Sequence, residues 1–309
     1  KQEEYWINLY SGEIPVLNMP LDYPRPQIQS FEGDSIDFSI DHELAKELNK
    51  LARETGSTLY MVLLAAYNVL LSKYTGQEDI IVGSPIAGRQ HADLDNLIGM
   101  FVNTLAMRNF PGSDKTFREF LSEVKDNALR AYENQDYQFE ELIEHLNLQR
   151  DMSRNPLFDT MFTMQNTANA KLEINGLKFT PYELKSRNAK FDFSLDASET
   201  DDTLSFSLEY CVKLFKRETI EKLSVHFMKI LKTIVENPNI ELAKINCLSQ
   251  EERNTIIFAF NNNKVEFDRS KTVHHLLEEH AQKLPGKIAV VYEDEQLTYK
   301  EVNDSTNRI

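Results

Sequence analysis

The sequence predicts an α/β fold, a mixed sheet covered by helices, and two observations lead to it. Apolar residues recur at helical spacing in some segments and at a spacing of two in others, so helices and strands share the chain. The composition agrees, because 309 residues with 41% hydrophobic and 27% charged side chains support a packed core and argue against disorder. This length is typical of one or two domains.

The N-terminal part of the chain is predicted to form an extended segment, a strand and a helix in turn. Four prolines limit regular structure in the first thirty residues, which should wrap a surface in extended form: Pro15, Pro20, Pro24 and Pro26. Residues 35–40 alternate as a strand does, and Asp41 is placed to cap a helix that Gly56 ends.

Residues 57–74 are predicted to form the central helix of the core, because apolar side chains occur nearly all round it. A short buried strand follows at residues 80–82. Glycine and proline then break regularity twice within residues 83–89, which predicts a shaped loop.

Residues 98–108 are predicted to form a buried strand. The run is too short to span a membrane, is rich in strand formers, and is bounded by Gly99 and by a turn at residues 109–112. Asn103 and Thr104 interrupt it, and each needs a partner inside, because an unpaired buried polar group costs about 1–3 kcal/mol. The run alone leaves two interpretations open, a satisfied core pair or polar groups that line a cleft.

Further helices and strands follow along the chain. Thr116 and Glu119 have capping-box spacing ahead of an amphipathic helix, and residues 139–146 repeat the helical pattern. Sheet strands are expected where the spacing changes to two, at residues 158–164, 191–195 and 204–210. A last amphipathic helix over residues 220–234 ends at an Asn-Pro-Asn stop.

Three runs together carry a family resemblance. They are residues 98–108, Asn-Gln-Asp-Tyr-Gln-Phe-Glu at residues 134–140, and Arg-Asp-Met-Ser-Arg-Asn-Pro-Leu-Phe at residues 150–158. In order and in approximate spacing they resemble the last three signature motifs of the condensation domains of nonribosomal peptide synthetases. Three multi-residue motifs in order are a specific signal, and the resemblance covers about residues 1–250.

The resemblance implies a domain organisation. Residues 1–240 are expected to form the C-terminal lobe of a condensation domain, with a chloramphenicol-acetyltransferase-like architecture. Residues 241–270 are interpreted as an interdomain linker with one short helix near residues 250–260. Residues 271–309 resemble the N-terminal start of an adenylation domain, truncated and too small to bury its own core. Both ends of the chain look cut from a longer polypeptide.

The same resemblance implies the chemistry. Condensation domains join a donor acyl group to an acceptor amine, each held as a thioester on the 4'-phosphopantetheine arm of a carrier protein, and they use the second histidine of a His-His-x-x-x-Asp-Gly motif. His274 and His275 are not followed by the Asp-Gly of that motif. They are interpreted as polar helix residues, and this interpretation is preferred to a metal site formed with His280. This chain alone is therefore expected to be inactive, with no directly bound cofactor and no metal. The implied partners are peptidyl carrier protein domains, the N-terminal lobe of the same domain and the adjoining adenylation domain.

Candidate site residues follow from the matched motifs. The resemblance implies a substrate-tunnel and lobe-interface set: Gly83, Ser84, Pro85, Gly99, Phe101, Asn103, Thr104 and Arg108. It implies a second, structural set: Asp136, Phe139, Arg150, Asp151, Arg154, Asn155 and Pro156. Asn103 and Arg108 are the leading candidates for fixing inter-lobe geometry, and a local ion-pair and turn network is favoured for residues 150–155. Glu140 and Glu141 open a helix, where acids favour the dipole, so an acid/base pair is rejected.

Charge and composition exclude several functional classes. The net charge of −15 argues against nucleic acid or an anionic membrane as partner. Cys211 and Cys247 are isolated thiols that fit a reducing compartment, and without a signal peptide or an apolar span a soluble, cytoplasmic protein is expected. An epimerisation-domain lobe and a non-catalytic docking lobe remain alternatives. A free-standing acyltransferase is disfavoured by the linker and the second domain's start.

Overall fold

The computed structural model describes residues 1–89, 92–94, 97–165, 187–199, 203–264, 266 and 270–308. The chain divides into two compact units, Lys1–Ser249 (unit 1) and Gln250–Ile309 (unit 2). Unit 1 contains the large sheet and the hydrophobic core, and unit 2 contains a separate two-stranded sheet.

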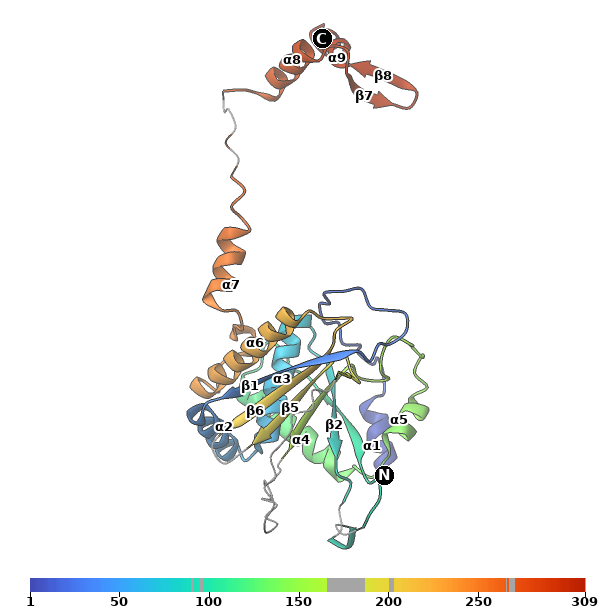
Figure 1. The fold of residues 1–309 in the computed structure, drawn as a ribbon, viewed down its shortest axis with the longest axis vertical. Helices are drawn as coiled ribbons and strands as arrows, with labels where there is room; N and C mark the ends of the chain where they lie inside the picture. Colours follow the sequence, from blue (N-terminus) through green and yellow to red (C-terminus); the bar gives the residue numbers. More distant parts are fainter. Residues whose placement is uncertain are drawn as a thin grey trace, which may run out of the picture. The chain divides into compact units, whose positions relative to one another are not determined.

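The described part of unit 1 is built on a six-stranded sheet (Figure 1). Its strands are β1 (Gly33–Ile40), β2 (Ile80–Ile86), β3 (Asn103–Asn109), β4 (Thr160–Gln165), β5 (Phe193–Glu199) and β6 (Leu204–Cys211). Their spatial order is β1-β6-β5-β4-β2-β3, in which β4 runs parallel to both β2 and β5 and the other neighbours are antiparallel. The predicted α/β class with a mixed sheet is therefore confirmed.

Helices cover the sheet, as predicted (Figure 1). They are α1 (Gln2–Leu9), α2 (His42–Thr55), α3 (Leu59–Thr75), α4 (Phe117–Glu133), α5 (Phe139–Leu146) and α6 (Arg217–Glu236), with short 3-10 turns η1 (Ala92–Leu94) and η2 (Leu242–Lys244). No described helix is by itself long and apolar enough to cross a membrane, and α2 with α3 meets that test only as a pair bent by 104°.

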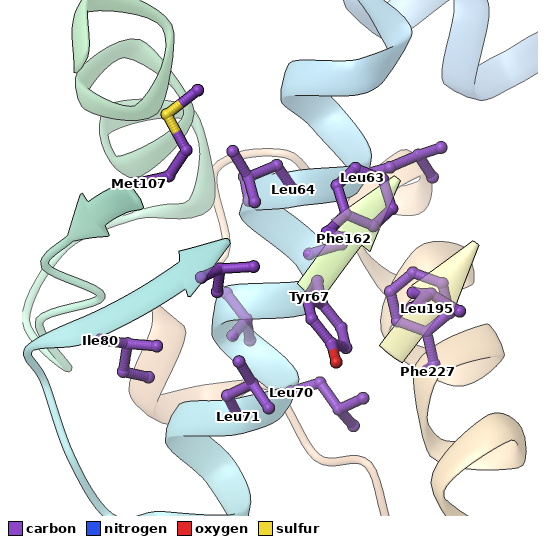
Figure 2. Close-up of a cluster of buried hydrophobic side chains, with 14 of the residues drawn as sticks. Leu63, Leu64, Tyr67, Leu70, Leu71, Ile80, Met107, Phe162, Leu195 and Phe227 are labelled. Atoms are coloured by element: carbon purple, nitrogen blue, oxygen red, sulfur yellow. The ribbon is translucent and has the colours of Figure 1, made fainter. Parts of the chain in front are cut away.

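The core of unit 1 is centred on α3, which packs against α2, α4 and α6. Figure 2 shows Leu63 and Tyr67 of α3 near Phe162 of β4 and Phe227 of α6. Burying one Leu or Phe side chain fully contributes about 1.5–3 kcal/mol to folding, so this helix organises the unit as its all-round apolar sequence predicts.

The ends of the helices follow the predicted capping residues. The Asp41 side chain accepts a hydrogen bond from the Leu44 amide at 2.8 Å, and Gly56 ends α2 in the left-handed conformation with φ 62°. Thr116 and Glu119 form the reciprocal capping box at the start of α4. These contacts satisfy backbone groups that a helix leaves unpaired at its termini.

The prediction of an irregular N-terminus is wrong for residues 2–9, which form α1. Trp6 is buried and its indole donates to the Asn134 carbonyl at 2.8 Å, while the buried Tyr10 hydroxyl donates to the Ala106 carbonyl at 2.7 Å. Packing of these two aromatic side chains outweighs a weak local helical pattern. From Ser11 up to the start of β1 the chain is largely irregular, as predicted.

The prediction is also wrong where β2 meets β3. Residues 83–86 continue β2 where a loop is predicted, and β3 begins only at Asn103. Pro85 is tolerated in β2 because β2 pairs with β4 only at Gly83, so the strand is open on that side beyond it. Residues 98–102 precede β3, and the apolar side chains among them are mostly exposed.

The described part of unit 2 contains six short elements. They are α7 (Gln250–Asn254), which continues as a π-helical turn η3 (Thr255–Ala259), then α8 (Val273–Lys283), β7 (Ile288–Tyr292), β8 (Glu295–Thr298) and α9 (Tyr299–Thr306). Among its described residues only Ala281 is buried. The prediction that residues 271–309 cannot bury a core of their own is confirmed for the described residues, whereas their assignment to an adenylation domain stays a prediction.

Candidate functional site

Residues 97–102 lead into β3 at the end of the sheet where the parallel strands β2 and β4 terminate (Figure 1). We call this segment the apolar loop, because four of its apolar side chains are exposed: Leu97, Ile98, Met100 and Val102. Met100 is 94% exposed and Ile98 is fully exposed. Burial of such side chains is strongly favourable, so a cluster of them on a protein surface marks a contact site.

Arg89, which follows β2, holds the apolar loop in place through contacts with its backbone and with Phe101. Its guanidinium donates to the Leu97 carbonyl at 2.9 Å and also to the Leu94 carbonyl, and it lies 4.3 Å from the centroid of the Phe101 ring. Gly88 has φ 65°, and a Cβ there would lie 1.8 Å from the Phe101 carbonyl oxygen. Only glycine fits that position, so the base of the loop has a defined shape.

Asn103, directly after the loop, is a fully satisfied buried amide. Its Nδ2 donates to the Gln135 and Tyr137 carbonyls, both at 2.9 Å. Its Oδ1 accepts from the Thr104 amide at 2.8 Å and the Phe139 amide at 3.2 Å. Asn103 therefore has the inside partners that its burial requires, and it ties β3 to the connection between α4 and α5.

The second motif, residues 134–140, is held from the other side by α1. The Gln2 Oε1 accepts from the Asp136 amide at 3.0 Å and the Tyr137 amide at 3.2 Å, and its Nε2 donates to Asp136 Oδ2 at 3.0 Å. Phe139 then packs on Phe158 of the third motif, with ring centroids 5.3 Å apart. The three motifs are thus brought together in one part of unit 1.

Arg108 lies at the opposite end of β3 and has internal partners. It forms a bidentate pair with Asp79 at 2.9 and 2.6 Å and donates to the Leu9 and Glu13 carbonyls. The Asp79 hydrogen bond raises the pKa of the Arg108 guanidinium despite partial burial. These contacts anchor the N-terminal segment to β3. Because Arg108 and Asn103 lie at opposite ends of β3, the structure does not place them next to each other.

The β2 members of the candidate set differ in what they contact. A Cβ on Gly83 would lie 2.3 Å from Phe158 Cε2, so the glycine lets that ring lie against the strand. Ser84 Oγ accepts from the Tyr60 hydroxyl at 2.8 Å. Pro85 pairs with Thr104 across the β2–β3 ladder, close to the apolar loop.

The charged part of the third motif forms a network that extends from the buried Asp159 to the exposed Asp151. Arg154 pairs with Asp159, donates to the Leu17 carbonyl at 3.2 Å and lies 3.9 Å from Asp151. Asp151 accepts from the Ser153 amide at 2.8 Å and hydroxyl at 2.6 Å, which lowers the pKa of Asp151. Burial, with the nearby Asp192 carboxylate as a second cause, raises the pKa of Asp159 to about 6.

The remaining members of this set are peripheral to the network. Asn155 donates to the Lys190 carbonyl at 2.9 Å, whereas Arg150 and Pro156 are exposed. Arg25, outside the motif, pairs with Asp192 and donates to the Ser153 carbonyl at 3.1 Å.

Several contributing residues were not predicted from the sequence. Arg89, Gly88 and Gln2 act through contacts with residues that local periodicity does not reveal. The only available signal was the Gly-Arg pair shortly before an apolar run.

No metal centre is formed by the residues that the structure describes, since no group of three or more His, Cys, Asp or Glu side chains could hold an ion. His274 and His275 lie on α8, are exposed, and have ring centroids 4.7 Å apart. Their position on a helix agrees with the interpretation as polar helix residues.

The fold and the three joined motifs define a member of the condensation domain family, to which the chain belongs, because that family's model matches residues 1–257. Over all 309 residues, 100% of the chain, it is 54% identical to bacitracin synthase 3 of Bacillus licheniformis and spans 5% of that protein. It is 55% identical to gramicidin S synthase 2 of Aneurinibacillus migulanus, again over 100% of the chain and 7% of that protein. The chain thus spans a small part of these relatives.

Solved structures share the fold. A four-domain nonribosomal peptide synthetase bound to AMP and glycine matches with a TM-score of 0.79 and 23% identity, covering 98% of this chain and 24% of that one. The X-domain from teicoplanin biosynthesis matches with a TM-score of 0.75 and 23% identity, and the match covers 80% of this chain and 57% of the X-domain. The chloramphenicol-acetyltransferase-like α/β fold is confirmed by these neighbours.

Proposed function

We propose that unit 1 is the C-terminal lobe of a condensation domain. It would supply one wall of the tunnel in which a carrier-bound acyl thioester meets a carrier-bound amine and a peptide bond forms. The observation that carries this proposal is the apolar loop, closed by Arg89 and exposed at the carboxyl end of the parallel strands. An opposing lobe that packed against Ile98 and Met100 would remove their apolar surface from water, which is favourable.

Two further observations support a lobe as opposed to a whole domain. The chain covers 57% of the teicoplanin X-domain and 52% of the first condensation domain of the CDA synthetase. The 309 residues contain no His-His-x-x-x-Asp-Gly sequence. We infer that the histidine is supplied by another segment and that this chain alone does not catalyse condensation.

The contribution of this lobe to catalysis would be positioning. Holding amine and thioester in attack geometry removes an entropic barrier from the reaction, and a rigid wall does this best. Asn103 and Arg89 would keep the β2–β3 end in shape, with Ser84, Pro85, Phe101 and Thr104 near the tunnel. Arg108 would act at a distance, by anchoring the N-terminal segment.

We further propose that residues 241–270 are an interdomain linker and that residues 271–309 begin an adenylation domain. A match over 98% of the chain to a four-domain synthetase supports this order. The proposed partners are peptidyl carrier protein domains, whose 4'-phosphopantetheine arms deliver both substrates, together with the N-terminal lobe and the adenylation domain. No other cofactor is part of the proposal.

The test is a condensation assay by intact mass with donor-loaded and acceptor-loaded carrier proteins. It compares this chain with a polypeptide extended upstream to restore the other lobe. We expect dipeptidyl carrier only from the extended polypeptide. Product from neither, with both folded, would favour the alternatives of an epimerisation lobe or a docking lobe.

A matched pair of variants tests the apolar loop within the extended polypeptide. Ile98→Ser with Met100→Ser should lower the condensation rate by about tenfold or more, because lobe contact loses apolar burial. Leu129→Ser removes an apolar side chain of α4 that is 45% exposed and lies outside the apolar loop, and it should leave the rate unchanged. Equal rates in both variants would remove the loop from the proposed wall.

A further inference from the structure

A cavity of about 910 Å³ lies in unit 1 between the N-terminal segment and α5. Residues 14–16 form one wall, and residues 147–152 and 154–159 complete the lining with one face of α5. Residues 154–159 lead to the amino end of β4, whereas the apolar loop follows the carboxyl end of β2, which runs parallel to β4. The cavity therefore lies away from the apolar loop, although Phe158 in its lining contacts Gly83 of β2.

The cavity has the size and the lining of a small-molecule site. Ligand pockets in proteins measure about 300–1,000 Å³ and are mainly apolar with a few placed polar groups. The apolar lining residues come from the N-terminal segment, α5 and the third motif: Ile14, Pro15, Val16, Ile143, Leu148, Met152, Leu157 and Phe158. An alkyl chain in the cavity would bury its apolar surface against these side chains and so leave water.

The charged lining residues favour a cation. Glu140 and Glu144 lie one helical turn apart on α5, and both are exposed at the cavity. Arg154 is already paired with Asp159, which leaves Arg150 as the exposed guanidinium among the lining residues. Deeper in the lining, Asp159 is 4% exposed and its Oδ1 has no hydrogen-bond partner. A donor-bearing, positively charged head group therefore complements this surface better than an anion.

We propose that this cavity is a second binding site, for an amphipathic amine. The apolar part of the ligand lies between Ile14, Ile143 and Met152, and the ammonium group lies on the acidic part of the lining that Glu140, Glu144 and Asp159 contribute. The proposal does not depend on condensation activity, because it concerns binding to unit 1 alone.

The test follows ligand binding by NMR on the whole chain with ¹³C-labelled methionine methyl groups. Octylamine, octanol and octanoate are the probes. We expect octylamine to shift the Met152 methyl resonance saturably and to bind about tenfold more tightly than octanoate. Met100, 94% exposed in the apolar loop, is the internal control and should not shift. Equal shifts of both methionines, or tighter binding of octanol or octanoate, would overturn the proposal.

Variants locate the ligand. Ile143→Trp fills the cavity and should weaken octylamine binding by about tenfold or more. Glu140→Gln with Glu144→Gln changes only exposed side chains and should weaken it about threefold to fivefold. Glu141→Gln, on the same helix but outside the lining, should have no effect. Unchanged affinity in the double glutamine variant would contradict the site even if Ile143→Trp did not fold.

Discussion

At the scale of single residues, buried polar side chains of unit 1 tie together segments that are far apart in the sequence. Asn103 joins β3 to the α4–α5 connection, Arg108 joins it to the N-terminal segment, and Arg25 joins that segment to Asp192. Each tie bonds a side chain to backbone carbonyls or carboxylates. Removal of one such side chain leaves its partners unpaired, which costs more than the bond itself contributes.

Replacement of Asn103 tests this directly. Asn103→Ala removes four hydrogen bonds and should lower the free energy of unfolding by about 2–4 kcal/mol. Urea unfolding followed by circular dichroism measures the change. Thr104→Ala, at the half-exposed neighbour, should cost under about 1 kcal/mol. A loss of condensation activity in Asn103→Ala of the polypeptide extended upstream, without a loss of stability, would instead indicate a direct role in the tunnel.

Asp159 predicts a pH dependence of stability. Its folded pKa of about 6 lies above the ordinary value of 3.8, so the folded state holds more protons than the unfolded state between these pH values. Its contribution to the free energy of unfolding therefore falls as pH rises from about 4 to 6, by about 3 kcal/mol at most.

The measurement is urea unfolding of the wild type and Asp159→Asn at several pH values. As pH rises through this range, the free energy of unfolding of the wild type should fall relative to that of Asp159→Asn. Asp151→Asn is the control, because the pKa of Asp151 is lowered and its contribution has the opposite sign. Parallel profiles for wild type and Asp159→Asn would contradict the prediction.

Residue roles were only partly predictable from the sequence. Burial of Asn103 predicts that partners exist, but those partners lie in a different motif and local spacing does not identify them. Arg108 was expected at the lobe interface, whereas its pair with Asp79 depends on how β2 and β3 align. Long-range pairing of this kind is a property of the folded chain.

At the scale of elements, β2 and the segment that leads into β4 meet in one close contact. Phe158 lies against Gly83, where a Cβ would overlap the ring at 2.3 Å. Pairing of β2 with β4 takes place at this same residue. The small side chain thus permits both the aromatic packing and the join between two parts of the sheet.

Gly83→Ala should therefore destabilise unit 1 by about 1–3 kcal/mol through overpacking. Thermal unfolding by calorimetry measures the shift, and Phe158→Leu should restore part of the loss in the double variant. Gly286→Ala, with nothing within 4 Å of the added methyl group, should have little effect. An additive result for Gly83→Ala and Phe158→Leu would show that the two side chains do not interact.

Elements with strong local signals were predicted well. The caps at Asp41 and Gly56 predict both ends of α2, and the cap at Thr116 predicts the start of α4, because capping is a contact between sequence neighbours. The start of β3 was predicted too early, since apolar residues 98–102 were assumed to be buried. Helix α1 was missed because its stability comes from Trp6 and the following Tyr10 packing on distant carbonyls.

At the scale of the whole molecule, the buried core belongs almost entirely to unit 1. The contiguous core cluster extends from Trp6 to Ile245, and the described part of unit 2 adds Ala281 outside it. Exposed apolar side chains on α8, β7 and β8 accompany this lack of a core. Unit 2 therefore contributes little to the cooperative unfolding of the chain.

Truncation after Ser249 should leave the unfolding midpoint of unit 1 within about 2 °C of the full chain. Differential scanning calorimetry of both proteins measures this, and the truncated protein should keep a single sharp transition. Loss of cooperativity in the truncated protein would mean that residues 250–309 stabilise the core.

The sheet of unit 1 contains a seam. Six aligned residue pairs join β4 to β5, from Thr160–Phe193 to Gln165–Ser198, but a single pair, Gly83–Met161, joins β4 to β2. Hydrogen exchange should be faster at amides along this seam than within either neighbouring ladder. A single aligned pair at Gly83 resists rotation of the β2–β3 ladder against β4 less than a six-pair ladder would. Such a rotation would shift Ile98 and Met100 relative to an opposing lobe while the pairs within the β2–β3 and β4–β5 ladders stay intact.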